Sequence, residues 1–381
     1  MDAPTDTIFE SLRSRADRRG EELMRAAIAC AERPLTSTSP NPRVGCVVAT
    51  PAGEIVGEGW HKGAGTDHAE TMALKDAGSD AKGAIAFVTL EPCNHTGRTG
   101  PCTRALIDAD VAEVVYAVDD PNPIAAGGSA TIREAGIHAT GGFLKDEASF
   151  VNRAWLKWIA EQRPYVTAKI AMSLDGRTAT QSGESQWITG EAARRAGHAM
   201  RANADAILVG AGTIIADDPA LTARLEQETR DPLRVVLDTS GRTPFGAKAY
   251  ERSGPGALLV TTNQIPEARA KQYRNHGVEI AKLIAGPDGR PDLDALLDEL
   301  GSRDIQSLMI EGGGEVIGAF FDGDLLDEIH IFTAPKLIGG GAPAFGGCGI
   351  EELADAENFD VASLGMVGED FHFRALRKER H

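Results

Sequence analysis

Two cysteines in one short loop, Cys93 and Cys102, constrain this chain more than any other feature of its sequence. The loop between them is rich in glycine, proline and polar residues, and His68 and Glu70 lie upstream of it. One imidazole and two thiolates form a common set of zinc ligands, and three protein ligands leave a coordination position for water, as in catalytic sites. The sequence therefore predicts a fold that brings His68 to both thiols.

Glu70 has a separate role in this pattern, because its place beside His68 at the start of a predicted helix over 68–77 suits proton transfer better than ligation. A carboxylate there can take a proton from water and deliver it to a leaving amine. Zinc-dependent nucleobase deaminases use this combination of one His, two Cys and one Glu. The residues thus predict hydrolytic loss of ammonia from an amidine-like ring carbon. A structural zinc site, or two unrelated buried thiols, is the alternative.

Length and charge narrow the class of protein. The chain has 381 residues, which favours about two or three domains. Its net charge of −17 argues against a nucleic-acid-binding protein, which usually carries a basic face. The first residues lack the apolar segment of a signal peptide, and no apolar run approaches the roughly 20 residues of a membrane span. We therefore expect a cytoplasmic protein whose partners include neither nucleic acid nor a membrane.

Five cysteines, an odd number, do not indicate a disulfide framework. Two of them belong to the metal pattern described above. The other three, Cys30, Cys46 and Cys348, are expected to be small buried hydrophobic residues.

Predicted strands and helices alternate along most of the chain, which indicates α/β architecture. In the first part we expect a β-hairpin followed by alternating helices and strands. The strands are predicted over 44–48, 54–61, 84–90 and 111–118, and the helices over 22–32, 68–77, 102–109, 131–135 and 145–161. This pattern predicts a three-layer α/β domain over residues 1–160.

A break at Glu161–Pro164 is predicted to be a linker, and a second α/β series follows it over 165–381. The strands of this series are predicted over 165–171, 206–209, 234–237, 257–261, 307–310 and 328–334, and the helices over 191–202 and 293–300. The predicted strand at 307–310 leads into Glu311 and three glycines, Gly312–Gly314. A strand, a glycine turn and a helix together can cradle a phosphate, but a tight turn without a ligand has the same pattern.

Several motifs together resemble one family. They are Ser39–Val47, Gly57–His61, His68–Glu70, the Pro-Cys-x8-Cys loop and Asp120–Pro123. The resemblance is to the bifunctional enzymes of riboflavin biosynthesis, which join a pyrimidine deaminase to a reductase, and it covers almost the whole chain. It implies an α/β fold with an N-terminal cytidine-deaminase-like domain and a C-terminal dihydrofolate-reductase-like domain. It also implies one Zn²⁺ per chain and NADPH as cofactors.

The resemblance also implies roles for individual residues. In the deaminase domain Glu70 would be catalytic, and His68, Cys93 and Cys102 would bind the metal. The residues expected to bind the deaminase substrate are Asn41, His61, Arg98, Asp120 and Asn122. The residues expected to bind the dinucleotide are Ala171, Trp187, Thr213, Asp217, Gly313, Gly314, Glu315, Val316, Ile317, Gly318 and Ala319. Those expected to bind the reductase substrate are Lys169, Ser185, Arg201, Leu221, Arg224 and Glu311.

The implied activity is hydrolytic deamination of 2,5-diamino-6-ribosylamino-4(3H)-pyrimidinone 5′-phosphate, followed by NADPH-dependent reduction of its ribosyl group to ribityl. The expected partners are this small phosphorylated pyrimidine and further copies of the chain, which would assemble through the reductase domain. Two alternatives remain open. The deaminase acts on another base or nucleotide, or the second domain is a nucleotide-binding module without turnover.

Overall fold

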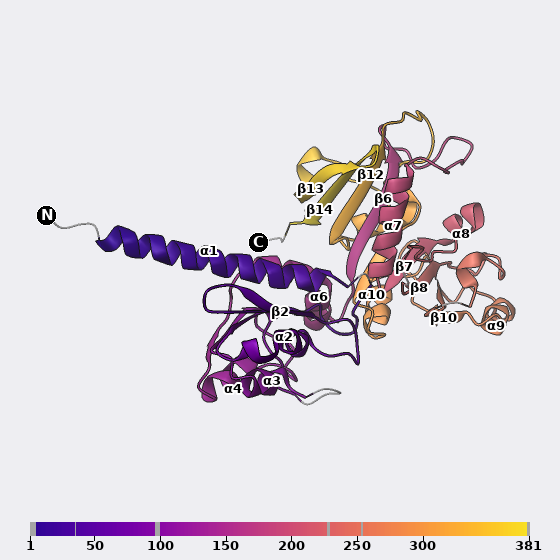
Figure 1. The fold of residues 1–381 in the computed structure, drawn as a ribbon. Helices are drawn as coiled ribbons and strands as arrows, with labels where there is room; N and C mark the ends of the chain where they lie inside the picture. The colour runs from indigo at the N-terminus through magenta and orange to yellow at the C-terminus, as the bar shows by residue number, and fades with distance from the viewer. Residues whose placement is uncertain (1–4, 35, 96–99, 227–228, 253, 379–381) are drawn as a thin grey trace. The chain divides into compact units, whose positions relative to one another are not determined.

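The fold is described from a computed structural model, over residues 5–34, 36–95, 100–226, 229–252 and 254–378, with side chains from residue 18 onward. Contacts divide the chain into two units, Met1–Glu161 and Gln162–His381. Each unit is built on one mixed β-sheet with helices packed against it (Figure 1). Across the described ranges, no helix combines the length and the apolar character that crossing a membrane requires.

The first unit contains a five-stranded sheet in the order β2-β1-β3-β4-β5. Strand β1 runs antiparallel to β2 and β3, whereas β3, β4 and β5 are parallel to one another. The strands are β1 Gly45–Ala49, β2 Ile55–Trp60, β3 Ile85–Leu90, β4 Glu113–Val118 and β5 His138–Thr140. The predicted hairpin is therefore confirmed, and β5 is a short strand that the sequence pattern did not indicate.

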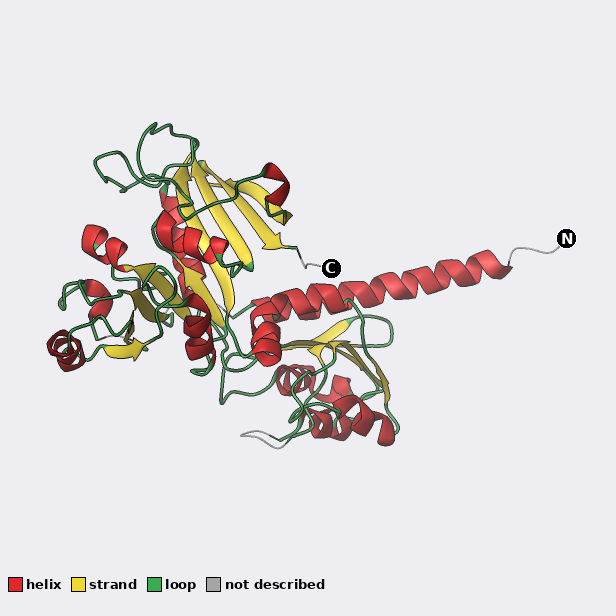
Figure 2. Ribbon diagram, turned by 180° about the vertical axis from the view of Figure 1, so that it is seen from behind, coloured by secondary structure: helices red, strands yellow, loops and turns green. Residues whose placement is uncertain are grey.

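Helices cover both faces of this sheet and produce three layers (Figure 2). They are α1 Thr5–Glu32, α2 Ala69–Ala77, α3 Cys102–Asp108, α4 Gly128–Glu134, α5 Lys145–Val151 and α6 Arg153–Glu161, with a short 3₁₀ helix η1 at Gly78–Ala81. One buried cluster joins the sheet to α2, α3 and α4 through Ala73, Leu106 and Ile132. A second cluster joins it to α1, α5 and α6 and includes Met24 and Trp155. The predicted three-layer α/β fold is confirmed.

Two glycines of β2 let α2 approach the sheet closely. A Cβ atom on Gly57 would lie 2.3 Å from the carbonyl oxygen of Ala73, and one on Gly59 would lie 2.1 Å from that of Ala69. A side chain at either position would force the two elements apart. The N-terminus of α2, which follows His68, is therefore held directly against the sheet.

The continuous helix predicted over 145–161 is wrong, because the chain forms α5 and α6 with a break at Asn152. The backbone of Asn152 has φ −101° and ψ 12°, and its side chain hydrogen-bonds the backbone of Arg43. Asn side chains commonly interrupt helices by bonding to backbone groups in this way. The apolar residues keep their helical spacing across the break, so the pattern alone could not reveal it.

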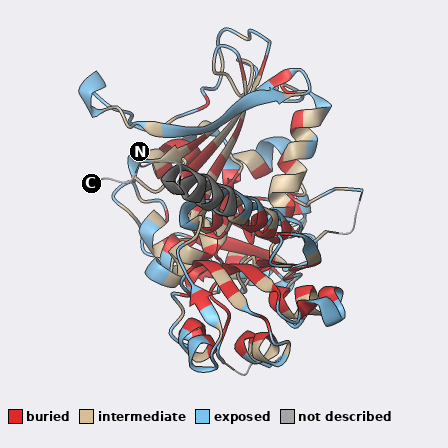
Figure 3. Ribbon diagram, turned by 60° about the vertical axis from the view of Figure 1, so that its left-hand side comes forward, coloured by how far each residue is buried: buried red, intermediate tan, exposed pale blue. Residues whose placement is uncertain are grey.

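The second unit contains a nine-stranded sheet in the order β10-β9-β8-β7-β11-β6-β12-β14-β13. The first seven strands of this order are parallel, and β14 is antiparallel to its neighbours β12 and β13. The strands are β6 Tyr165–Ser173, β7 Ala206–Gly210, β8 Leu233–Leu237, β9 Ala257–Thr261, β10 Glu279–Lys282, β11 Ser307–Ile310, β12 Glu328–Ala334, β13 Phe359–Val367 and β14 Asp370–Arg377. Strand β13 is exposed along most of its length (Figure 3).

Helices again pack on both faces of this sheet. They are α7 Glu191–Asn203, α8 Ala211–Asp217, α9 Glu267–Asn275, α10 Leu293–Gly301 and α11 Gly314–Asp322, with 3₁₀ helices η2 Lys248–Tyr250 and η3 Leu353–Asp355. Leu296 of α10 and Phe320 of α11 belong to the cluster on one face. Ile214 of α8 and Tyr273 of α9 belong to the cluster on the other. One expectation fails here, because Cys348 is exposed rather than buried.

Candidate active sites

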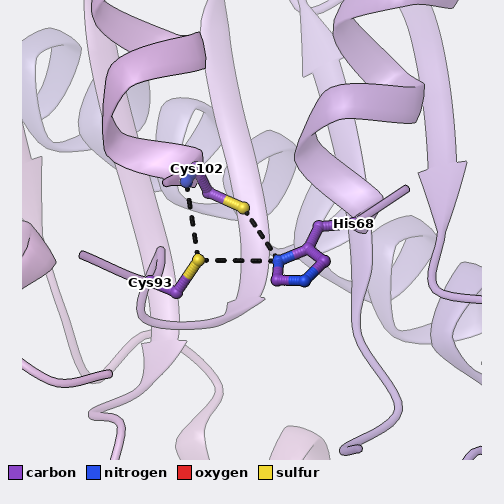
Figure 4. A group of neighbouring side chains, drawn as sticks. All are labelled: His68, Cys93 and Cys102. Atoms are coloured by element: carbon purple, nitrogen blue, oxygen red, sulfur yellow. Dashed lines mark hydrogen bonds between the residues drawn. The ribbon is translucent and has the colours of Figure 1, made fainter. Parts of the chain in front are cut away.

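The structure of the first unit brings the predicted metal ligands together. His68 is the residue directly before α2, Cys102 is the first residue of α3, and Cys93 follows the end of β3. The His68 Nδ1 atom lies 3.1 Å from Cys102 Sγ and 3.5 Å from Cys93 Sγ. Figure 4 shows both sulfurs facing the same side of the imidazole. The three ligand atoms lie within 4.8 Å of one another.

This donor set fits a zinc ion. Two ligands of one tetrahedral zinc ion are separated by roughly 3.5 Å, which follows from the usual Zn–N and Zn–S bond lengths. A hydrogen bond from the Cys102 thiol, together with His68, lowers the pKa of Cys93 against the effect of burial, while the same hydrogen bond and burial raise the pKa of Cys102. Zinc binds the thiolate form of cysteine, so a thiol that ionises readily is suited to ligation.

Glu70 lies beside this set without belonging to it. It occupies the first turn of α2, and its side chain is only 3 % exposed. Burial, reinforced by the negative charge of Cys93, raises the pKa of Glu70 to about 7. A carboxyl group with such a pKa can both accept and donate a proton near neutral pH.

Two of the residues predicted to bind the deaminase substrate touch each other. The Nδ2 atom of Asn41 lies 3.0 Å from Nε2 of His61. The His61 ring also meets the His68 ring edge to face, with 5.5 Å between centroids. Burial lowers the pKa of His61, which favours its neutral form. His61 therefore adjoins a metal ligand and Asn41 adjoins His61, which places both near the metal site.

The turn after β4 carries two more of the predicted substrate residues, Asp120 and Asn122. Asp120 is 9 % exposed, and burial raises its pKa to about 6. Its Oδ1 atom accepts from the backbone of Asn122 at 2.9 Å, while the Asn122 side chain accepts from the backbone of Ile124. These contacts shape a turn, so Asn122 has a structural role whether or not it meets a ligand. Arg98 lies outside the described residues.

A cavity of about 2110 Å³ occupies the second unit. It lies where β7, β8 and β11 end and where α8 and α11 begin, which is the edge of an open α/β sheet that usually binds ligands. Sixteen of the seventeen residues predicted to bind the dinucleotide or the reductase substrate line it, so these two predicted groups share one cavity. The exception is Gly318, where an added Cβ would lie 2.2 Å from the carbonyl oxygen of Gly346.

At one end of this cavity, two cations hold a carboxylate. The Lys169 Nζ atom lies 3.1 Å from Glu311 Oε1, and Arg201 Nε lies 2.7 Å from Glu311 Oε2. Burial alone would raise the pKa of Glu311, but the charges of Lys169 and Arg201 outweigh it and lower the pKa to about 2. Glu311 is therefore ionised at neutral pH. The three groups form a charged part of the cavity wall.

Elsewhere in the cavity the structure leaves room for a dinucleotide. Gly313 lies directly before α11, and a Cβ on it would meet nothing within 4 Å. Exposed backbone at the start of a helix is a favourable environment for phosphate. The Trp187 ring is 63 % exposed and lies under the guanidinium of Arg194, 4.7 Å from its centroid. The residues present therefore fit a phosphate-containing cofactor with flat rings.

Two polar residues near the sites were not predicted from the sequence. Glu91 is buried, and its carboxylate accepts from the backbone of Ser129 at 2.9 Å and of Asp120 at 3.3 Å. Asn152 bonds the backbone just after Asn41, as described above. In the sequence, the position of Glu91 directly before Pro92-Cys93 was the only indication that it has a role at the site. Nothing in the sequence indicated such a role for Asn152.

Comparison with known proteins assigns both units. Residues 164–373 match the family described as the RibD C-terminal domain. Residues 17–118 match the cytidine and deoxycytidylate deaminase zinc-binding region. The riboflavin biosynthesis protein RibD of Escherichia coli is 42% identical over 368 residues, covering 92% of this chain and 97% of that protein. The RibD of Mycobacterium tuberculosis is 40% identical over 354 residues, covering 92% of this chain and 95% of that protein.

Solved structures of similar proteins match the fold of nearly the whole chain. Form 1 of Acinetobacter baumannii RibD has a TM-score of 0.84 at 37% identity and covers 95% of this chain and 100% of that one. A Thermotoga maritima protein described as a diaminohydroxyphosphoribosylaminopyrimidine deaminase/5-amino-6-(5-phosphoribosylamino)uracil reductase has a TM-score of 0.83 at 33% identity, with the same coverage. A zinc-binding deaminase region is thus followed by a reductase domain, and the chain belongs to the RibD family of bifunctional deaminase/reductase enzymes in riboflavin biosynthesis.

Proposed function

We propose that this chain deaminates a diaminopyrimidinone ribosyl 5′-phosphate with the help of zinc and then reduces the ribosyl group to ribityl with NADPH. Deamination is assigned to residues 1–160 and reduction to residues 165–381. The observation that carries the proposal is the convergence of His68 Nδ1 on two cysteine sulfurs, next to the buried carboxyl group of Glu70. A ligand set of this composition with a base beside it is typical of hydrolytic deaminases.

In the first unit His68, Cys93 and Cys102 would hold the zinc ion, which supplies Lewis acidity when bound. Glu70 takes a proton from the attacking water and delivers it to the departing amine. A carbon–oxygen bond forms at the ring carbon, the carbon–nitrogen bond breaks, and ammonia leaves. The raised pKa of Glu70 supports this exchange, since its protonated and ionised forms have similar free energies near pH 7.

The pyrimidine would be held by the groups around this centre. His61 adjoins the His68 ring, Asn41 contacts His61, and Asp120 lies buried in the turn after β4. Amide, imidazole and carboxyl groups together match the donors and acceptors on the edge of an aminopyrimidine. The roles of Asn122 and Arg98 rest on the family resemblance.

In the second unit the reductase residues surround one cavity. NADPH supplies the hydride when bound, and the acceptor would be C1′ of the ribosyl group in its ring-opened imine form. The open backbone at Gly313 and the exposed ring of Trp187 would bind the dinucleotide. Lys169, Arg201 and Glu311 would contact the sugar, and Arg224 would bind its phosphate because a guanidinium matches phosphate geometry.

The test measures both reactions on the intact chain. The diaminopyrimidinone phosphate alone should release ammonia, and addition of NADPH should then consume the reduced nicotinamide, followed by its absorbance. Ammonia release without NADPH consumption would favour a second unit that binds nucleotide without turnover. Ammonia release from another base, but not from this substrate, would favour a deaminase of different specificity.

A further inference from the structure

A buried asparagine far along the chain holds the loop that carries Asn41. Asn152 lies between α5 and α6 and is only 4 % exposed. The backbone nitrogen of Arg43 donates to Asn152 Oδ1 at 2.8 Å, and Asn152 Nδ2 donates to the carbonyl oxygen of Arg43 at 2.8 Å. One side chain thus satisfies both backbone groups of a residue 109 positions away. A paired bond of this kind, shielded from water, fixes the position and the orientation of the peptide it binds.

Arg43 in turn fixes the rest of the loop. Its guanidinium donates to the carbonyl oxygens of Pro34 and Thr36, both at 2.9 Å. The Thr38 hydroxyl donates to the carbonyl oxygen of Asn41 at 2.9 Å, and the Asn41 backbone nitrogen donates back to Thr38 at 3.1 Å. Asn41 therefore lies in a folded turn whose exit is anchored by Asn152.

The contact between Asn41 and His61 fixes which atom of the Asn41 amide is left for a ligand. His61 Nδ1 lies 3.2 Å from the carbonyl oxygen of Asp67, which can only accept a hydrogen bond. The proton of the neutral imidazole is therefore on Nδ1, and Nε2 accepts from Asn41 Nδ2 at 3.0 Å. This contact uses the nitrogen of the Asn41 amide and leaves Oδ1 to accept from a ligand. An aminopyrimidine, which carries N–H donors on its edge, matches that acceptor.

We propose that Asn152 is a positioning residue for deamination, acting through Arg43 on Asn41 and His61. The inference rests on the proposed function of the first unit and adds a residue outside its ligand set. Small displacements of a substrate-binding group weaken binding strongly, because the hydrogen bonds to the ligand lose their geometry. Loss of the Asn152 bonds should therefore act on substrate binding more than on the metal or on Glu70.

The first experiment measures deaminase kinetics of the full chain with Asn152→Ala and Asn152→Asp. The Asp side chain is the same size and still accepts from the Arg43 nitrogen, but it repels the Arg43 carbonyl oxygen. We expect KM for the diaminopyrimidinone phosphate to rise about five- to tenfold, the equivalent of one lost hydrogen bond. We expect kcat to stay within about twofold, because the lost contacts hold the bound substrate and the transition state equally well. Zinc content and NADPH-dependent reduction should match the parent protein.

A double-mutant cycle distinguishes positioning from general destabilisation. If Asn152 acts through Asn41, adding Asn152→Ala to Asn41→Ala should raise KM no further than Asn41→Ala alone. Trp155→Phe is the matched control, since Trp155 is buried in the adjacent α6 and belongs to an apolar cluster rather than to the Asn152–Arg43 hydrogen bonds. It should lower the unfolding temperature without changing KM. An unchanged KM in both Asn152 variants, additive increases in the cycle, or an equal rise in Trp155→Phe would overturn the proposal.

A second readout does not need turnover. Hydrogen exchange at the Arg43 amide should be slow in the parent chain and much faster in Asn152→Ala, because the acceptor of that amide is removed. Slow exchange of the Arg43 amide in Asn152→Ala would show that Asn152 does not hold this peptide. A parent chain that releases no ammonia would instead contradict the proposed function and leave this readout intact. Global unfolding of both Asn152 variants at the assay temperature would also overturn the proposal, since the role would then be structural.

Discussion

Lys169 Nζ lies 3.1 Å from Glu311 Oε1, although the two residues are 142 positions apart in the sequence. Lys169 belongs to β6 and Glu311 directly follows β11, and these strands are adjacent and parallel in the sheet. Topology, rather than local sequence, therefore creates the pair. Arg201 reaches the same carboxylate from α7 at 2.7 Å. The result is a carboxylate held ionised at the end of the cavity where the substrate of the reductase is expected.

Glu311→Gln should lower the rate of reduction by about 100-fold, because the groups that orient the sugar lose their common anchor. Deamination by the same protein should be unaffected. The measurement is NADPH oxidation with the deaminated substrate, compared with ammonia release. Glu267→Gln serves as control, since Glu267 is exposed on α9 and pairs with Arg274 and Lys282 at the surface. Equal rates for Glu311→Gln and the parent would remove Glu311 from the site.

The same substitution predicts a pH dependence of stability. The Glu311 pKa falls from 4.5 to about 2 on folding, so the ionised carboxylate stabilises the fold above about pH 4.5. Each unit of pKa difference corresponds to about 1.4 kcal/mol, so this stabilisation is about 3 kcal/mol.

The difference in unfolding free energy between the parent and Glu311→Gln should therefore be constant from pH 7 to about pH 5 and shrink as the pH falls towards 2. Denaturant titrations at several pH values measure it. A difference that grows on acidification would contradict the assignment.

Glu70→Gln should reduce ammonia release by about 10²- to 10⁴-fold, the usual contribution of a general acid–base. Zinc should remain bound, because Glu70 is not one of the converging ligands. Ammonia release and metal content of the same preparation provide the two measurements. Retained activity would place the proton transfer elsewhere, and loss of zinc would make Glu70 a ligand.

Substitutions of two glycines of the α11 region, Gly313 and Gly318, should have different effects: one on NADPH binding and the other on stability. Gly313→Ala adds a methyl group to open space in the cavity, whereas Gly318→Ala forces one to within 2.2 Å of the Gly346 carbonyl oxygen. We expect Gly313→Ala to keep its unfolding temperature and to bind NADPH more weakly, and Gly318→Ala to unfold at lower temperature. Nicotinamide fluorescence titration and thermal unfolding measure these effects. Unchanged NADPH affinity in Gly313→Ala would show that no ligand approaches that backbone.

Sequence reasoning recovers the parts of this molecule whose signals are local. The buried parallel strands, such as β9 at Ala257–Thr261, appear as short apolar runs, and His68, Glu70, Cys93 and Cys102 form a recognisable metal-site pattern. The reductase residues, by contrast, were implied by the family resemblance. Strands β10, β13 and β14 were missed because none of them presents a continuous buried face. Strand β10 is only four residues long, β13 is exposed along most of its length, and only Asp370 and Ala375 of β14 are buried.

The supporting residues could not be predicted for a different reason. Asn152 and Glu91 act on backbone groups that only the folded chain brings near them. Nothing in the neighbouring sequence distinguishes them from polar residues on a surface. Their roles depend on tertiary contacts, as does the pairing of Lys169 with Glu311.

The most direct test measures metal content and ammonia release together on the purified full chain. We expect one zinc ion per chain, and we expect a chelator to remove both the ion and the deaminase activity while NADPH-dependent reduction continues. Re-addition of zinc should restore ammonia release. Full deamination by protein that contains no stoichiometric metal would contradict the central assignment of His68, Cys93 and Cys102.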